Sequence, residues 1–179
     1  SSNREALEDG HNPVFDDGIT KLDLTGCTSL EEVYCSNNNI PGLSLSGAAS
    51  LRILECSSTN LGTLDLSGCS SLTELNCVFA QLNQLNLSGC IALEKLDCYG
   101  NQLNALNLSG LTQLKELQCA DNQLSSLDLS GLSQLENLWC SRNQLTALDL
   151  SGLSQVKRGQ CDENQLSSLI LTGLESLTH

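Results

Sequence analysis

The chain has 179 residues, with 21 acidic against 8 basic side chains and a formal net charge of −13. This acidity argues against binding to nucleic acid or to an anionic membrane surface, because both require a basic face. No apolar run approaches the roughly 18 residues that a membrane-spanning helix needs, so membrane insertion is not expected. Apolar residues make up 40% of the chain but aromatic residues only 3%, which predicts one domain with an aliphatic core.

Residues 1–18 lie outside any repeat, and we interpret them as an N-terminal cap. The stretch NREALED at 3–9 predicts a short helix that covers the first repeat with Ala6 and Leu7. Asp16, Asp17 and Gly18 then turn the chain. Their order partly resembles a calcium loop, but the ligand spacing of such a loop is missing, so a cap is favoured over an ion site. The segment also lacks the composition of a secretion leader.

Residues 19–179 form an array with a period of 21 residues. Its clearest mark is a cysteine that returns at this spacing: Cys35, Cys56, Cys77, Cys98, Cys119, Cys140 and Cys161. The array divides into a half-unit at 19–26, seven full units at 27–173 and a partial unit at 174–179. A fixed period of this length indicates a solenoid, because one unit cannot bury its apolar face without neighbours.

The unit at 111–131, LTQLKELQCADNQLSSLDLSG, carries the motif L-x-x-L-x-C-x-x-N-x-L, which is found over residues 19–177. The motif resembles the leucine-rich repeat, and the short unit with Cys in place of the usual Leu resembles a bacterial subclass of that family. The resemblance implies a right-handed coil with a parallel sheet on its concave side. It also implies a secreted or surface-displayed bacterial protein that engages a protein of a host or neighbouring cell, although a cytoplasmic location stays open.

Two strand-like segments are expected in each unit. Leu117 and Cys119 alternate with a polar residue, which predicts a half-buried strand. The Asn that follows, Asn122 in this unit, is expected to turn inward and pair with backbone groups of adjacent coils. The same leucine spacing returns ten residues later at Leu124, so the return side is predicted to be strand-like as well. Helices are therefore not expected outside the cap, and the solenoid is expected to be flatter than helix-backed relatives.

The ten cysteines are predicted to be buried free thiols rather than disulfides or metal ligands. Cys27, Cys69 and Cys90 open units where later units have Leu, which favours a buried apolar role for them too. No pair has the C-x-x-C spacing of a zinc site, and no cofactor is expected. The only histidines, His11 and His179, do not accompany a plausible nucleophile, so the chain is predicted not to be an enzyme.

Outward positions of the Cys-bearing strand differ between units and are the candidate partner-binding positions. Four of the five aromatic residues stand there, although an aliphatic core does not need them. Exposed aromatic residues on a rigid sheet are common anchors of protein interfaces. We select them with three neighbours as candidate site residues: Tyr34, Ile53, Val78, Phe79, Tyr99, Trp139 and Arg142.

The second and third units depart most from the motif. Thr59 and Ala80 replace the turn Asn, and Val78 and Phe79 make an apolar stretch beside Tyr99. Two interpretations stay open: an exposed apolar patch, or a loop that turns Phe79 inward.

The return strand is more uniform at its outward position, where Asp and Asn recur: Asp23, Asp65, Asn86, Asn107, Asp128 and Asp149. A solvated face is the favoured interpretation, and cation binding is the alternative. In the last full unit Gly159 stands where the others have Leu or Val, so this coil is expected to pack less well. It marks either a poorly capped end or a fragment of something longer.

The sequence as a whole predicts a non-catalytic protein-binding module that uses the variable face of the repeat sheet. One alternative is a structural spacer within a larger bacterial surface adhesin. Another is the recognition arm of a longer multidomain protein.

Overall fold

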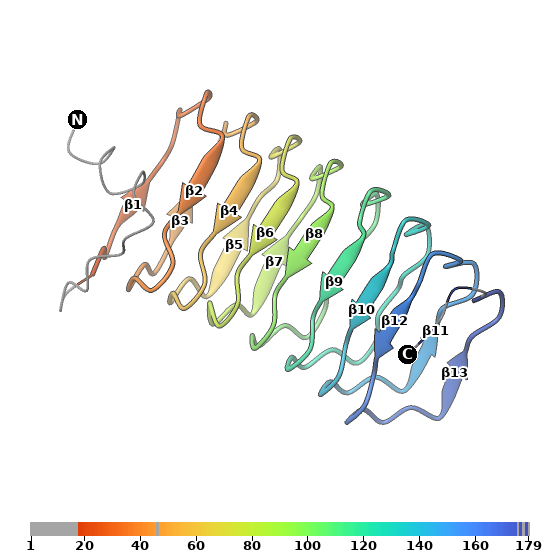
Figure 1. The fold of residues 1–179 in the computed structure, drawn as a ribbon. Coiled ribbons are helices and arrows are strands. Elements are labelled where there is room, and N and C mark those ends of the chain that lie inside the picture. The colour runs from red at the N-terminus through yellow and green to blue at the C-terminus, as the bar shows by residue number, and fades with distance from the viewer. Residues whose placement is uncertain (1–17, 46, 175, 177, 179) are drawn as a thin grey trace.

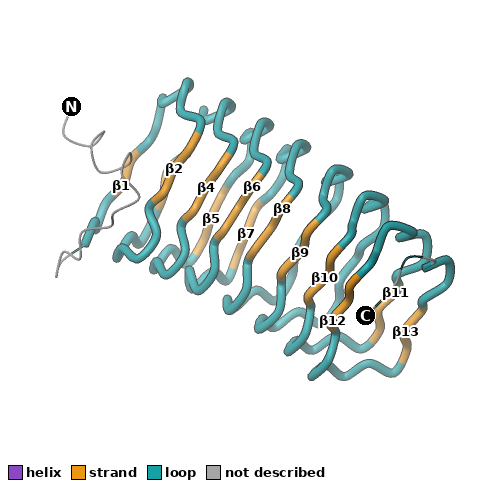
Figure 2. Tube along the Cα trace, in the orientation of Figure 1, coloured by secondary structure: helices purple, strands orange, loops and turns teal. Residues whose placement is uncertain are grey.

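The computed structural model describes residues 18–45, 47–174, 176 and 178. The described chain is wound into stacked coils, and each coil contributes one segment to either side of the stack (Figure 1). No helix occurs among the described residues (Figure 2), which confirms the β-rich solenoid predicted from the repeat. The helix predicted at 3–9 and the turn at Asp16 and Asp17 lie outside the described residues.

One side of the stack is a parallel sheet that runs along the described array. Within the described residues it has seven strands: β2 (Glu32–Tyr34), β4 (Ile53–Glu55), β6 (Glu74–Asn76), β8 (Lys95–Asp97), β9 (Glu116–Gln118), β10 (Asn137–Trp139) and β12 (Arg158–Gln160). The register equals the repeat length, so that Leu117 pairs with Leu96 on one side and with Leu138 on the other. We call the outward side chains of these strands the ladder face.

The return side is also extended, as the second copy of the leucine spacing predicts. Parallel pairs form there between β1 (Leu22–Asp23) and β3 (Leu43–Ser44), between β5 (Thr63–Asp65) and β7 (Gln84–Asn86), and between β11 (Ala147–Asp149) and β13 (Ser168–Ile170). The coils between β7 and β11 follow the same path without regular strand pairing.

Acidic and amide side chains on the return side close their own turns. Asp65 Oδ1 accepts a hydrogen bond from Ser67 N at 2.9 Å, and the same bond forms at Asp23, Asn86, Asn107, Asp128 and Asp149. Because backbone N–H donors stabilise the charged carboxylate, they hold the pKa of Asp65 below its usual range. These side chains thus stabilise a turn within their own coil.

The core is a stack of aliphatic columns between the two sides. Val33, Leu54, Leu75, Leu96, Leu117 and Leu138 form one fully buried column. The ladder cysteines form the next column, and all ten cysteines of the chain are free thiols. Burial raises the pKa of Cys35, Cys90 and Cys140 to about 12. These side chains therefore pack as small apolar groups rather than as reactive thiolates.

The two ends of the array depart from the predicted burial of all cysteines. Cys27 is exposed, so the prediction that it is buried like Cys69 and Cys90 is wrong. Cys161 is only half-buried, in the coil that contains Gly159. Cys161 belongs to the last full coil, where fewer neighbours cover a side chain than in the middle of the stack, whereas Cys27 is exposed in a unit whose Cys35 is buried.

The turn asparagines join successive coils, as their position predicts. Asn122 donates through Nδ2 to Cys98 O of the preceding coil at 3.0 Å and to Cys119 O of its own coil at 3.2 Å. Its Oδ1 accepts from Leu103 N at 3.0 Å. Asn101, Asn143 and Asn164 repeat this pattern.

Where the Asn is absent, other groups take over part of its role. Thr59 donates through Oγ1 to Cys56 O at 2.7 Å, and the carbonyl of Ala80 accepts from Leu61 N at 3.1 Å. The same coils gain a chain of surface amides in which Gln81 bonds to Asn60 and Asn60 to Asn39. At these two coils, a buried hydroxyl and a backbone carbonyl thus replace part of the asparagine contacts, and surface amides add bonds between coils.

Candidate functional site

The ladder face carries two rows of outward side chains. The row next to the cysteines runs through Tyr34, Glu55, Asn76, Asp97, Gln118, Trp139 and Gln160, and the second row runs through Glu32, Ile53, Glu74, Lys95, Glu116, Asn137 and Arg158. Adjacent members of a row are one strand spacing apart, about 4.8 Å. The face therefore presents a dense and non-repeating set of side chains.

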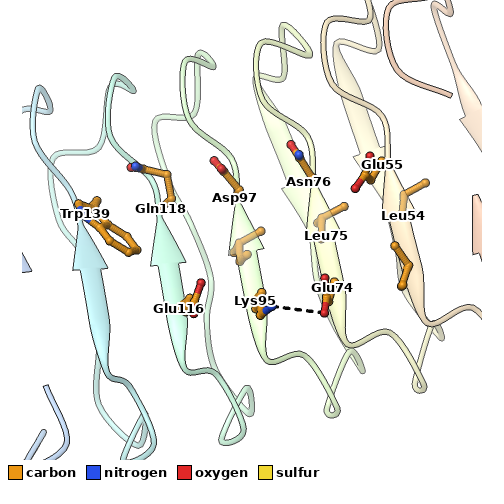
Figure 3. Close-up of a pocket in the computed structure, with 12 residues that line it drawn as sticks. Leu54, Glu55, Glu74, Leu75, Asn76, Lys95, Asp97, Glu116, Gln118 and Trp139 are labelled. Carbon is orange, nitrogen blue, oxygen red and sulfur yellow. Dashed lines mark ion pairs between the residues drawn. The ribbon is translucent and has the colours of Figure 1, made fainter. Parts of the chain in front are cut away.

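A shallow hollow of about 370 Å³ lies on this face between β4 and β10. Ile53 of β4 lines it, and Trp139 lies at the β10 end, opposite Glu55 of β4 (Figure 3). The rest of its walls and floor come from Leu54, Glu55, Glu74, Leu75, Asn76, Lys95, Leu96, Asp97, Glu116 and Gln118. The hollow is thus one surface to which five consecutive coils contribute.

Negative charge dominates the hollow. Four carboxylates and one ammonium line it, and the ammonium of Lys95 pairs with Glu74 at 3.5 Å, as Figure 3 shows. Asp97 is half-buried, and its Oδ1 accepts a hydrogen bond from Tyr99 N at 3.1 Å. Burial raises the pKa of Asp97, although the Tyr99 hydrogen bond acts in the opposite direction. No ion pair among the described residues includes this carboxylate.

An aromatic corner formed by Phe79, Tyr99 and Gly100 adjoins the hollow. The Phe79 and Tyr99 rings meet edge to face with their centroids 5.2 Å apart. The Phe79 ring lies against Gly100, where an added Cβ would overlap it. Phe79 is 53% exposed, so of the two interpretations of this segment the structure adopts the outward one.

The backbone of Phe79 is left-handed, with φ at 51°. This conformation is uncommon for a bulky side chain and costs about 1 kcal/mol. Each described coil has a left-handed residue at the equivalent position, and in the neighbouring coil it is Gly100, with φ at 68°. The repeat geometry therefore sets the backbone, and the glycine leaves room for the ring.

The remaining predicted site residues do not gather at one point. Tyr34 is 39% exposed on β2, where its hydroxyl donates to Glu32 at 3.0 Å, and it does not line the hollow. Val78 is half-buried beside Phe79. Arg142 is exposed on the turn edge, where it pairs with Glu163 at 3.0 Å and with Asp121 at 3.6 Å. Its charge is therefore largely satisfied within the chain.

Several residues of the hollow were not selected from the sequence, above all Glu55, Asp97 and Glu116. The signal for them was present, because they occupy the same outward positions as the selected aromatics. Charged outward residues are a common feature of any solvated face, so the sequence did not distinguish them from their neighbours. Their shared position in one hollow follows from the in-register stacking.

Among the described residues, no group of three or more His, Cys, Asp or Glu side chains is arranged to hold a metal ion. The same part of the chain contains no helix that is long and apolar enough to cross a membrane.

Comparison with known proteins agrees with this fold. A family model described as leucine-rich repeats in two copies matches residues 112–155. No curated protein matches the chain. Among solved structures, internalin C2 from Listeria monocytogenes is 26% identical, with a TM-score of 0.78, over 92% of this chain and 75% of that one.

Two further solved structures are similar. The functional domain of InlJ from Listeria monocytogenes, described as including a cysteine ladder, is 27% identical, with a TM-score of 0.63, over 90% of this chain and 43% of that one. A leucine-rich-repeat protein of Leptospira interrogans shares the fold at 21% identity, with a TM-score of 0.72, over 84% of this chain and 48% of that one. The chain thus spans less than half the length of either protein.

The repeat motif and the coil thus agree with the leucine-rich-repeat family, whose model matches residues 112–155, and with these solved structures. Leucine-rich-repeat proteins of the internalin type are in general protein-interaction modules and typically not enzymes.

Proposed function

We propose that this chain is a non-catalytic protein-binding module and that the ladder face is its recognition surface. The observation that carries the proposal is the placement of aromatic side chains. Tyr34, Phe79, Tyr99 and Trp139 all stand on or beside the ladder face, whereas the core is built from Leu, Ile, Val, Ala and Cys. Aromatic residues that a core does not need are the side chains that most often anchor protein interfaces.

The contrast between the two sides of the solenoid supports the same assignment. On the return side, the recurring Asp and Asn residues cap their own turns. On the ladder face, the side chains differ from coil to coil, and Asp97 and Trp139 line an open hollow. A surface that varies while its scaffold repeats is suited to specific recognition.

The proposed setting is a bacterial surface or secreted protein whose partner is a protein of a host or neighbouring cell. The similarity to the two Listeria monocytogenes proteins supports the bacterial setting. A spacer segment of a larger adhesin and the recognition arm of a multidomain protein are the competing functions. A spacer does not need an aromatic corner on its surface.

Affinity capture tests the proposal. The intact array is immobilised, the captured protein is identified and purified, and its Kd is measured by calorimetry. Replacing Tyr34, Phe79, Tyr99 and Trp139 with Ser should weaken binding at least about a hundredfold, because each buried aromatic anchor contributes about 1–2 kcal/mol or more. The control replaces four exposed return-side residues, Gln84, Asn104, Ser126 and Ser168, with Ala.

The control variant should bind within about twofold of the unmodified array. Equal binding by the two variants would favour a different surface, and failure to capture any protein that binds in purified form would favour the spacer function.

A further inference from the structure

We infer that the hollow on the ladder face binds a basic side chain of the partner, an Arg or Lys, while an adjacent apolar side chain of the partner packs on the aromatic corner. The inference rests on the proposed function and specifies the chemistry of the partner: an exposed protein segment with a cationic and an apolar residue side by side.

The charge distribution in the hollow is complementary to a cation. In the row next to the cysteines, Asp97 stands between two neutral amides, Asn76 and Gln118, one strand away on either side. Glu55 lies beyond Asn76 in the same row. The one cation of the hollow, Lys95, already pairs with Glu74 in the second row. The centre of the hollow thus presents carboxylate oxygens without an opposing charge.

The half-burial of Asp97 increases the benefit of such a partner. A carboxylate that has lost part of its water is less stable in its charged form, which is why burial raises the pKa of Asp97. Its Oδ1 already accepts from Tyr99 N, and neither neighbouring amide carries a positive charge. A guanidinium or ammonium that enters the hollow would restore the missing stabilisation through charge-assisted hydrogen bonds.

Trp139 provides a second type of contact for the same cation. Its indole is half-buried at the β10 end of the hollow and extends toward β9 (Figure 3). A cation over the face of an indole is attracted by the ring, and Arg in addition stacks its planar group on it. Trp139 and Asp97 are two strands apart, with Gln118 between them, about 10 Å across. The long stem of an Arg or Lys suits this span because it is apolar below its charged end.

The aromatic corner supplies the apolar half of the site in a rigid form. Phe79 is fixed from below by Gly100 and from the side by Tyr99, so little side-chain freedom remains to be lost on binding. Tyr99 also joins the corner to the hollow, because its backbone N–H donates to Asp97. The two halves therefore keep a constant spacing, and neighbouring residues of one partner segment can occupy both.

Selection from a displayed library of random dodecapeptides provides the probe. Peptides are selected on the intact array, and their Kd is measured by the fluorescence of Trp139, the one tryptophan in the chain. The test variant combines Asp97→Asn with Glu116→Gln. The matched control, Asp128→Asn with Asp149→Asn, removes the same charge from the return side. Asn76 stands at the position equivalent to Asp97, Asn86 stands at the position equivalent to Asp128 and Asp149, and Gln is close in size to Glu, so folding should be preserved.

The selected peptides should be enriched in Arg or Lys next to an aromatic or aliphatic residue. The hollow variant should weaken their binding about tenfold, and the return-side control should change it less than about twofold. Trp139-dependent binders without basic residues, or equal affinity in the two charge variants, would overturn the inference and leave the proposed function standing. Binders that do not depend on the ladder face at all would overturn both.

Discussion

At the scale of single residues, the buried asparagines have the widest effect on the stack. The side chain of Asn122 contacts four backbone groups in two coils, and it is one of the few polar side chains in the core. Two of the carbonyls that it reaches also accept from another Asn, since Asn101 donates to Cys98 O and Asn143 donates to Cys119 O. Among the described residues, Asn122 Oδ1 is the one hydrogen-bond acceptor of the Leu103 N–H.

Replacing Asn122 with Ala should therefore lower the free energy of unfolding by about 2–3 kcal/mol, which is the cost of a buried unpaired donor plus weakened acceptors. Urea denaturation followed by circular dichroism measures the loss. The neighbouring Gln123 is exposed, and its replacement with Ala should change stability by less than about 0.5 kcal/mol. A similar small effect at both positions would show that the interior amides contribute little.

At the scale of elements, two glycines of the ladder side differ in whether the structure leaves room for an added side chain. Gly159 in β12 pairs with Leu138, its φ is not positive, and a Cβ added there meets nothing within 4 Å. Gly100 follows β8 with φ at 68°, and a Cβ added there would overlap the Phe79 ring. The same substitution should thus have opposite signs at the two positions.

Gly159→Ala should raise the free energy of unfolding by about 0.4–1 kcal/mol, because alanine loses less backbone entropy in a strand. Gly100→Ala should lower it by about 1 kcal/mol or more through left-handed strain and displacement of the ring. Thermal and urea unfolding of the two variants measure both changes in the free energy of unfolding. Adding Phe79→Ala to Gly100→Ala separates the two costs, because only the ring overlap disappears in the double variant.

At the scale of the whole molecule, the stack buries most of the thiols. Eight cysteines are buried, Cys161 is half-buried in the last full coil, and Cys27 is exposed in the first full unit, where Cys35 is already buried. Burial raises the pKa of the interior thiols, so few of them are thiolates at neutral pH. Reactivity should therefore report the integrity of the stack.

Titration of the native protein with a thiol reagent should show rapid reaction of Cys27, slower reaction of Cys161 and protection of the other eight cysteines. In denaturant all ten should react at similar rates. Mass spectrometry after brief labelling assigns the sites. Rapid labelling of Cys77 or Cys98 in the native protein would contradict the buried column.

The sequence predicted the architecture because a constant period determines the register of every coil. The 21-residue spacing places Leu117 beside Leu96 and Leu138 whatever the surface residues are. The exposure of Cys27 was missed because equivalence with Cys69 holds only inside the stack. The hollow was not predicted either, because its depth depends on how far neighbouring side chains such as Asn76, Gln118 and Trp139 extend. The outward position of Phe79 depends on Gly100 in the next coil, a pairing that becomes visible once the coils are stacked.

The loss of two interior asparagines, at Thr59 and Ala80, also determines how the stack comes apart. In a linear array, stability is the sum of the coils and of the coupling between neighbours. At these two junctions the interior amide bonds are missing, and the exposed amides of Asn39, Asn60 and Gln81 stand in for them in competition with water. The molecule therefore does not melt evenly along its length. We expect its first coils to separate before the asparagine-linked block from 77 to 164, so that one flank of the recognition surface loosens while the other stays assembled.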